Sequence, residues 1–348
     1  MTTTAQRVPY LDRLRIFAAF CVVVLHVCAG PWQSLPPAEL TWQAINLFNA
    51  LVRFSVPVFF MLSGAVFLAP EREVLPRRLF GRHLLRMVTA FLFWSLAYSV
   101  TFNVLLPDAA DWPAFWRDFA YGHYHMWFLF TMMGLYIATP MLRCICRERR
   151  CAEYFLLVSF LAVICVNTLK LIPPLTAIVE ATMAKLHLEF FLGCTGYFVL
   201  GHYLASYALP RRFERAICLL GGVSLVFTVA ATAILSVRDG VGNTTWFGNL
   251  LPNTYFTAAA MFLLFRRRAN AAPKTELRGK VVMTLSRLTF GIYLVHDFFI
   301  KLLAGLGLTA DAFAPVITVP LSALIVFVLS AAASWALGKI PVVNRYLV

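Results

Sequence analysis

The chain has 348 residues, of which 61% are hydrophobic, 15% aromatic and 13% charged. A soluble domain carries roughly 25% charged and 45–50% apolar residues, so this composition excludes a soluble enzyme, a disordered protein and a disulfide-stapled secreted domain. The formal net charge of +14 fits either nucleic-acid binding or the basic loops of a membrane protein. The positions of the charges distinguish these two readings.

Ten apolar stretches follow one another along the chain, each long enough to cross a bilayer, which takes roughly 20 residues. Trp, Tyr and Pro mark many of their ends, as is typical of lipid interfaces. The sequence therefore predicts an all-α, polytopic transmembrane helix bundle, with residues 1–348 as a single integral membrane domain. The expected spans lie near residues 11–30, 44–69, 87–106, 123–142, 152–172, 187–208, 216–236, 250–266, 285–306 and 313–337.

Basic loops alternate with acidic or neutral ones along the chain. Of the 30 Lys and Arg residues, 24 lie near the two termini or in the basic loops 72–86, 143–150, 211–215 and 266–287. Positively charged loops stay on the cytoplasmic side of a membrane, so we expect both termini there. Topology thus explains the net charge, and we expect membrane lipids and no nucleic acid as partners.

The eight cysteines form no C-x-x-C pair, and most lie in apolar runs or beside basic loops. We expect them to act as small apolar residues or as reduced thiols on the cytoplasmic face. Cys144 and Cys146 have no second pair to match them, and the chain offers no carboxylate-rich ligand set. No metal site is therefore expected.

The first span carries two ionisable residues, Arg15 and His26, eleven positions apart. Eleven residues make about three turns of an α-helix, so the two side chains share one face, roughly 16 Å apart along the axis. A charge inside a bilayer costs roughly 2.5–3.5 kcal/mol on insertion scales, which makes each such residue a candidate for function. A histidine bonded to a neighbouring carbonyl, with an arginine that reaches the interface, is the structural alternative.

Ionisable residues in four other spans map, like His26, to the outer half of the membrane. Each has a structural explanation, such as ion pairing, an aromatic interfacial belt or a polar contact between helices. Independent structural roles would scatter in depth, so the common depth favours a shared polar cavity. These residues are Arg53, His125, Glu189 and His296, with Trp127 and Asp297 beside two of them.

The segment after the second span is strongly basic. Arg78, Arg82 and Arg86 are spaced at i, i+4 and i+8, which places them on one face if the segment is helical. Three guanidinium groups in a row suit the binding of a polyphosphate. Contact with anionic lipids and a role in setting the topology are the alternative.

Four stretches together point to a family. They are Asp12-Arg13-Leu14-Arg15 followed by His26, Arg53 with residues 56–64, residues 125–129 with 134–136, and residues 290–296. In their order and spacing, the chain resembles the acyltransferase-3 family of integral membrane O-acyltransferases over about residues 10–338. It looks most like the bacterial surface-polysaccharide O-acetyltransferases, such as the one acting on enterobacterial common antigen. Asp297 departs from the pattern, because the family often has Pro at that position.

The resemblance implies transfer of an acyl group, usually acetyl, from cytoplasmic acetyl-CoA to a hydroxyl of a surface carbohydrate or its lipid-linked precursor. It places the protein in the bacterial inner membrane. The critical Arg and His of the family's first span match Arg15 and His26. The basic segment with Arg78, Arg82 and Arg86 is similar to the family's coenzyme-binding segment. A succinyl donor or a small secreted acceptor also fits.

The residues suit this reaction. His26 is the expected general base, because imidazole titrates near neutral pH and accepts a proton from an attacking hydroxyl; an acyl-histidine intermediate is the alternative. Arg53 is the first candidate to stabilise the oxyanion, and His296 is a further catalytic candidate. A polytopic secondary transporter is the rival function, because it too has many spans with buried charges. The residues expected to orient the base or hold the acceptor are His125, Trp127, Glu189 and Asp297.

Overall fold

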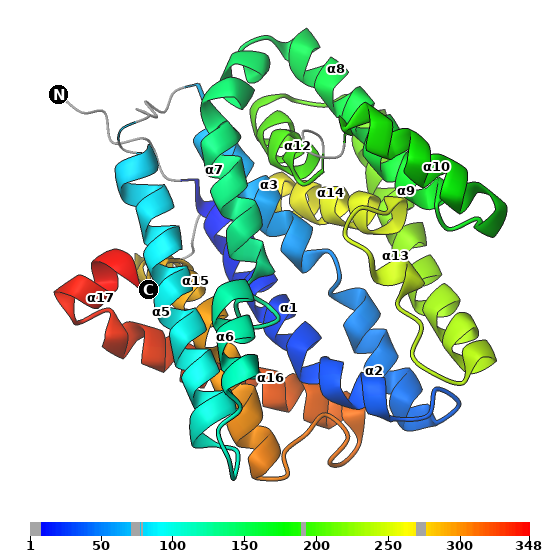
Figure 1. The fold of residues 1–348 in the computed structure, drawn as a ribbon. Helices are drawn as coiled ribbons and strands as arrows, with labels where there is room; N and C mark the ends of the chain where they lie inside the picture. Colours follow the sequence, from blue (N-terminus) through cyan, green and yellow to red (C-terminus); the bar gives the residue numbers. More distant parts are fainter. Residues whose placement is uncertain (1–7, 71–76, 78, 189–192, 269–275) are drawn as a thin grey trace.

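The computed structural model describes residues 8–70, 77, 79–188, 193–268 and 276–348, and every regular element within them is helical. Helix α1 (Pro9–Ser34) runs through the middle of the bundle in Figure 1 and packs against α2, α3, α14, α15 and α16. Its residues Leu14, Ala18 and Cys28 are fully buried. The helix with the predicted Arg15–His26 pair is therefore the central element of the fold.

Eight helical stretches in the described parts of the chain are long and apolar enough to cross a membrane. Each overlaps a span expected from the sequence. The first four are Pro9–Ser34 (α1), Leu40–Phe67 (α2, Leu40–Leu51; α3, Ser55–Phe67), Leu79–Leu105 (α5, Leu85–Val100, between π-helical turns at Leu79–Leu84 and Thr101–Leu105) and Trp127–Cys146 (α7). The others are Arg149–Leu169 (α8, Arg149–Ser159; a π-helical turn, Phe160–Cys165; α9, Val166–Leu169), Arg211–Asp239 (α13), Glu276–Gly305 (α15) and Pro315–Leu337 (α16).

The two remaining expected spans fall on shorter helices. The stretch near 187–208 contains α12 (Thr195–Ser206), and the stretch near 250–266 contains α14 (Pro252–Arg267), which have 12 and 16 residues. Neither reaches the roughly 20 residues that span a bilayer without help from flanking segments. The all-helical, multi-pass fold is confirmed, whereas the number of spans and the side of the termini stay predictions.

Helices also form where the sequence predicted loops. They are α6 (Trp112–Tyr121), α10 (Pro173–Leu186), α17 (Pro341–Tyr346) and a 3₁₀ turn at Thr245–Phe247. Helix α6 begins at a capping residue, because the Asp111 carboxylate accepts a hydrogen bond from the Ala114 backbone N–H at 3.0 Å. Proline in the first turn starts each of the three helices, where its missing N–H costs nothing.

The second expected span is broken in the middle. Helix α2 ends at Leu51 and α3 begins at Ser55, with Arg53 in the turn between them. Pro57 explains the break, because it has no N–H for the carbonyl four residues before it, and its ring clashes with that carbonyl in a continuous helix. The arginine that the sequence places inside a span thus lies where the backbone is interrupted.

Two glycines allow α3 and α12 to pack backbone against backbone. A Cβ on Gly64 would overlap the Phe198 carbonyl, and a Cβ on Gly201 would overlap the Met61 carbonyl. Small residues at helix contacts permit this close approach in membranes, where van der Waals packing and not hydrophobicity drives association. The contact fixes α3, which lines the cavity described next.

Candidate active site

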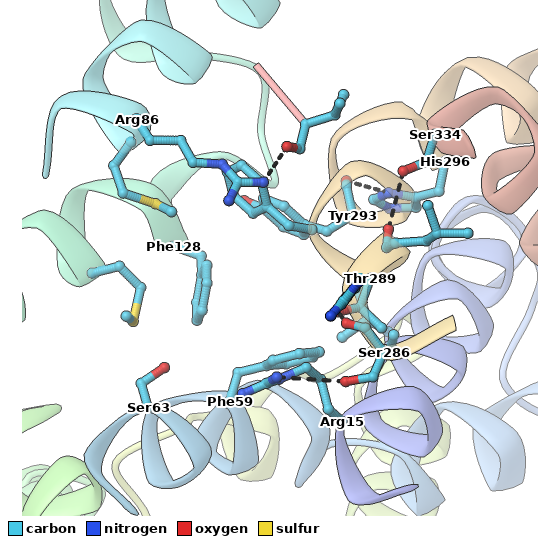
Figure 2. Close-up of a pocket in the computed structure, with 18 of the residues that line it drawn as sticks. Arg15, Phe59, Ser63, Arg86, Phe128, Ser286, Thr289, Tyr293, His296 and Ser334 are labelled. Carbon is cyan, nitrogen blue, oxygen red and sulfur yellow. Dashed lines mark hydrogen bonds between the residues drawn. The ribbon is translucent and has the colours of Figure 1, made fainter. Parts of the chain in front are cut away.

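A cavity of about 820 Å³ opens between α1, α3, α5, α7, α15 and α16. It lies within the roughly 300–1,000 Å³ range of small-molecule sites. Figure 2 shows Arg15 and Arg86 on opposite sides of this space, with the Phe128 ring beside it. Seven residues singled out from the sequence line it: Arg15, His26, Arg82, Arg86, His125, Trp127 and His296.

Two histidines from different helices form the polar centre of the cavity. His26 Nδ1 of α1 lies 2.7 Å from His296 Nε2 of α15, and the two rings are stacked with centroids 4.8 Å apart. His296 Nδ1 lies 2.6 Å from the Tyr293 carbonyl oxygen. Two of the five residues that the sequence predicted at a common depth, His26 and His296, are thus in direct contact.

The hydrogen bonds assign the tautomers of the uncharged pair. A carbonyl oxygen only accepts, so His296 Nδ1 carries the hydrogen that it donates to Tyr293. His296 Nε2 then has a lone pair and accepts from His26 Nδ1. His26 Nε2 is left with its own lone pair, which is the state that a general base needs.

A turn before α7 adds further titratable groups. His123 Nδ1 lies 3.0 Å from His125 Nδ1, Tyr124 donates a 2.8 Å hydrogen bond to Asp297 Oδ1, and His123 Nε2 lies 3.5 Å from Asp297 Oδ2. The ring of His125 lies 5.0 Å from that of His296 and 6.0 Å from that of His26. Histidines from α1, α15 and this turn therefore form one cluster, with the carboxylate of Asp297 at its edge.

This turn differs from the expectation that residues 123–126 open the fourth span. Gly122 has φ of 80°, a left-handed conformation that ends α6, and α7 begins only at Trp127. Burial lowers the pKa of His123 to about 4 against the opposing charge of Asp297, so this imidazole is uncharged at neutral pH. Burial also raises the pKa of Tyr124, which keeps its hydroxyl protonated as a donor to Asp297.

The other end of the cavity is basic. Arg15 Nη1 lies 3.5 Å from Ser286 Oγ, and Ser286 in turn donates a 2.6 Å hydrogen bond to Asp12. Arg86 is half-buried, donates to the Val348 carbonyl and stacks over the Phe290 ring. These bonds hold the two guanidinium groups in place at the cavity wall.

Arg82 lies on the π-helical turn Leu79–Leu84 and is exposed at the cavity wall. The predicted arginine stripe is therefore only partly tested, because Arg78 lies outside the described residues. Arg287 and Lys339 also line the cavity. Both are among the basic residues near the termini and in the basic loops, and the sequence predicted neither as part of a site.

Arg53 lies apart from the cavity lining. Its Nη2 donates a 2.5 Å hydrogen bond to Asn49 Oδ1, and its guanidinium carbon lies 3.7 Å above the centre of the Phe247 ring. Its Nε is buried without a hydrogen-bond partner. Of the other predicted site residues, Glu189 lies outside the described part of the chain.

Sequence reasoning missed three residues that complete the cluster: His123, Tyr124 and Tyr293. The Tyr293 hydroxyl donates a 2.8 Å hydrogen bond to the His125 carbonyl, and its own carbonyl fixes the tautomer of His296. The run His123-Tyr124-His125 and the three-residue spacing of Tyr293 and His296 were the available signals. These signals did not show that the residues share one site, because the sequence does not show that the turn before α7 lies next to α15.

A model of a family of acyltransferase domains matches residues 8–339, which is nearly the whole chain. The chain belongs to the acyltransferase-3 family. No curated protein and no solved structure matches it. The protein is thus a membrane O-acyltransferase of many helices, and its basic and histidine-lined cavity is the candidate active site of that acyltransferase.

The described residues of this acyltransferase contain no group of three or more His, Cys, Asp or Glu that could hold a metal ion. The cavity offers instead an imidazole pair with a free lone pair, together with cationic side chains on its wall. These are the groups that acyl transfer by acid–base chemistry uses.

Proposed function

We propose that the protein transfers an acetyl or related acyl group from cytoplasmic acyl-CoA to a hydroxyl of a surface carbohydrate or its lipid-linked precursor. The observation that carries the proposal is one cavity with arginines on its wall and the His26–His296 pair within it. We propose that Arg15, Arg82 and Arg86 bind the phosphates of the donor, because one guanidinium group can donate two parallel hydrogen bonds to phosphate oxygens.

The length of the cavity suits a donor with a long, thin arm. Arg15 and His26 are both on the continuous helix α1 and both line the cavity. Their separation along the helix axis is roughly 16 Å. A donor whose phosphates lie near Arg15 therefore places its thioester, at the end of the arm, close to His26.

His26 acts as the general base in this proposal. Its Nε2 takes the proton of the acceptor hydroxyl while the hydroxyl oxygen attacks the thioester carbonyl and forms the new C–O bond. Collapse of the tetrahedral intermediate breaks the C–S bond, and the proton passes to the departing thiolate. The products are an ester and free coenzyme A. His296 positions His26 by accepting its Nδ1 hydrogen.

Arg53 stays the proposed source of positive charge for the oxyanion. Because it lies outside the cavity lining, it would act through the electrostatic field of its guanidinium group and not through a hydrogen bond. His125 and Trp127 face the same cavity and are proposed to hold the reacting groups in place.

The proposal includes an orientation in the membrane. The basic loops favour a cytoplasmic location for the arginine end, which is where acyl-CoA is found. The histidine end then lies deeper, toward the outer side of a bacterial inner membrane. A surface glycan or its precursor on that side is the acceptor.

The proposal is tested with purified protein in nanodiscs, labelled acetyl-CoA and glycan extracted from cells that lack the gene. We expect the wild-type protein to label the glycan and His26→Ala to lose at least about 10²-fold in rate. Equal rates for the two proteins contradict the mechanism. Uptake of a solute by proteoliposomes without any acyl donor would instead identify a transporter.

The same protein separates direct transfer from an acyl-histidine intermediate. Quenching a reaction without acceptor traps a covalent acyl-enzyme if one forms. Direct transfer predicts no label on the protein under these conditions. Label on wild-type protein that is absent from His26→Ala identifies His26 as the acyl carrier.

A further inference from the structure

A second cavity, of about 760 Å³, lies on another side of the histidine cluster. It is enclosed by the end of α1, the second half of α15, the loop at 306–314 and α16. His26 lines both this cavity and the one with the arginines. His26 therefore lies between the two cavities.

Two carboxylate oxygens on the second cavity have no hydrogen-bond partner. Asp297 is 1% exposed, and its Oδ2 has only His123 Nε2 at 3.5 Å, beyond a good hydrogen bond. Asp311 Oδ1 is likewise buried and without a hydrogen-bond partner. A buried acceptor without a partner is costly, and more so when it is charged, so such groups in a folded protein call for a donor.

The other polar groups of this cavity suit a hydroxyl-rich ligand. Gln33, Ser34, Tyr124, Thr309 and Ser322 line it alongside the two aspartates. Amides, hydroxyls and carboxylates each bond to hydroxyl groups, which both donate and accept.

The charge of the lining distinguishes neutral from anionic ligands. Among the described lining residues, Lys301 has a cationic side chain, whereas Asp297 and Asp311 have carboxylates. An anionic ligand would meet two like charges against one opposite charge, and like charges brought together in such a site are strongly unfavourable. The lining therefore favours an uncharged ligand over an anionic one.

We propose that the second cavity binds the acyl acceptor as an uncharged, hydroxyl-rich sugar unit, and that Asp311 is a specificity-determining residue for it. The inference rests on the proposed function, because it needs a donor in the first cavity. The acceptor hydroxyl approaches His26 from the second cavity, and the thioester of the donor approaches it from the first. Its proton goes to His26 and then to the thiolate, and the acyl carbon passes from sulfur to oxygen.

Asp297 and Asp311 have distinct parts in this site. Asp297 is bonded to Tyr124 and lies within the histidine cluster, so it binds the sugar close to the reacting hydroxyl. Asp311 lies on the loop after α15, lines the cavity and is separate in sequence from the histidine cluster. Its carboxylate recognises another hydroxyl of the same sugar unit.

The test measures sugar binding without any acyl donor, by saturation-transfer NMR on the full chain in nanodiscs. The probes are methyl glycosides of glucose, galactose, mannose and N-acetylglucosamine, with glucuronate and galacturonate glycosides as their anionic counterparts. We expect at least one neutral glycoside to bind, each uronate to bind at least about tenfold more weakly, and Asp311→Asn to weaken the neutral glycoside about tenfold. Coenzyme A is expected to leave sugar binding unchanged.

Asp239→Asn is the matched control, because this carboxylate is exposed at the end of α13, bonded to Arg238 and outside both cavities. Thermal unfolding of both variants verifies their fold, and Asp297→Asn gives a second test if Asp311→Asn does not fold. Absence of binding by every neutral glycoside, equal binding of the uronates, or competition by coenzyme A overturns the inference. Sugar binding without acetyl transfer would overturn the proposed function alone.

Discussion

At the scale of single residues, the chemistry depends on which nitrogen of each histidine carries a hydrogen. The Tyr293 carbonyl fixes His296, His296 fixes His26, and the result is a lone pair on His26 Nε2. Three imidazoles in contact cannot all be charged, because like charges at this distance repel strongly in an apolar site. Mutual repulsion among the three rings therefore favours an uncharged His26, the form in which its Nε2 has a free lone pair.

His296→Ala removes the acceptor for the His26 Nδ1 hydrogen. We expect kcat to fall by roughly 10²-fold or more while the KM for acetyl-CoA stays within about twofold, because the ring orients the base and leaves the arginines untouched. His296→Gln offers an amide oxygen as acceptor and should recover part of the loss. Steady-state kinetics with labelled acetyl-CoA measures kcat and KM. An unchanged kcat in His296→Ala contradicts the role of His296 in positioning His26.

Arg82 tests the donor end of the cavity. Arg82→Ala removes one exposed cation from the lining, so we expect the KM for acetyl-CoA to rise about tenfold with kcat nearly unchanged. Tenfold corresponds to about 1.4 kcal/mol, slightly less than a typical charged hydrogen bond, because solvent screens an exposed side chain. Arg345→Ala is the control, because Arg345 is an exposed arginine of α17 outside the lining. An equal rise in KM for both variants would indicate an effect of the overall positive charge of the protein and not a phosphate-binding site at Arg82.

The sequence predicted the relative position of site residues that share one helix. It did not predict the position of site residues that lie in a turn. Arg15 and His26 were placed on one face of a helix by periodicity alone, and both line one cavity. His123 and Tyr124 could not be placed, because the left-handed Gly122 directs the chain away from the helical path. Asp311 lies on a loop, where no periodicity relates sequence spacing to position.

At the scale of elements, breaks and close contacts in the helices position the site. Pro57 interrupts the α2–α3 stretch at Arg53, and glycines allow α3 and α12 to touch. The apolar runs of the sequence predicted the long helices, because burial and lipid both require apolar side chains. They did not predict that α12 and α14 are shorter than the other apolar helices, since composition alone does not fix where a helix begins and ends.

Gly201→Ala tests the contact between α3 and α12. The new methyl group would overlap the Met61 carbonyl, a backbone atom that cannot move alone, so we expect a loss of at least about 1–3 kcal/mol in stability. Gly222→Ala in α13 meets open space and should be neutral or stabilising by roughly 0.5–1 kcal/mol. Thermal unfolding in detergent compares them; a Gly201→Ala protein as stable as the wild type would show that the helices can separate without cost.

At the scale of the whole molecule, two cavities meet at one imidazole in the centre of a helical bundle. Arginines line the first cavity, carboxylates and hydroxyls line the second, and His26 belongs to both. The composition predicted the membrane bundle, and the depth of the ionisable residues predicted a shared polar space. The division of that space into two depends on how α15, α16 and their connecting loop pack, which no sequence period encodes.

The proposed function makes the enzyme a transferase that works across the membrane, and sidedness tests this most directly. Labelled acetyl-CoA is sealed inside proteoliposomes, and glycan extracted from cells that lack the gene is added outside. We predict that molecules whose arginine end faces the lumen label the external glycan, and that His26→Ala vesicles do not. Label that appears only when donor and glycan share one compartment, or that forms equally with His26→Ala, would contradict the account.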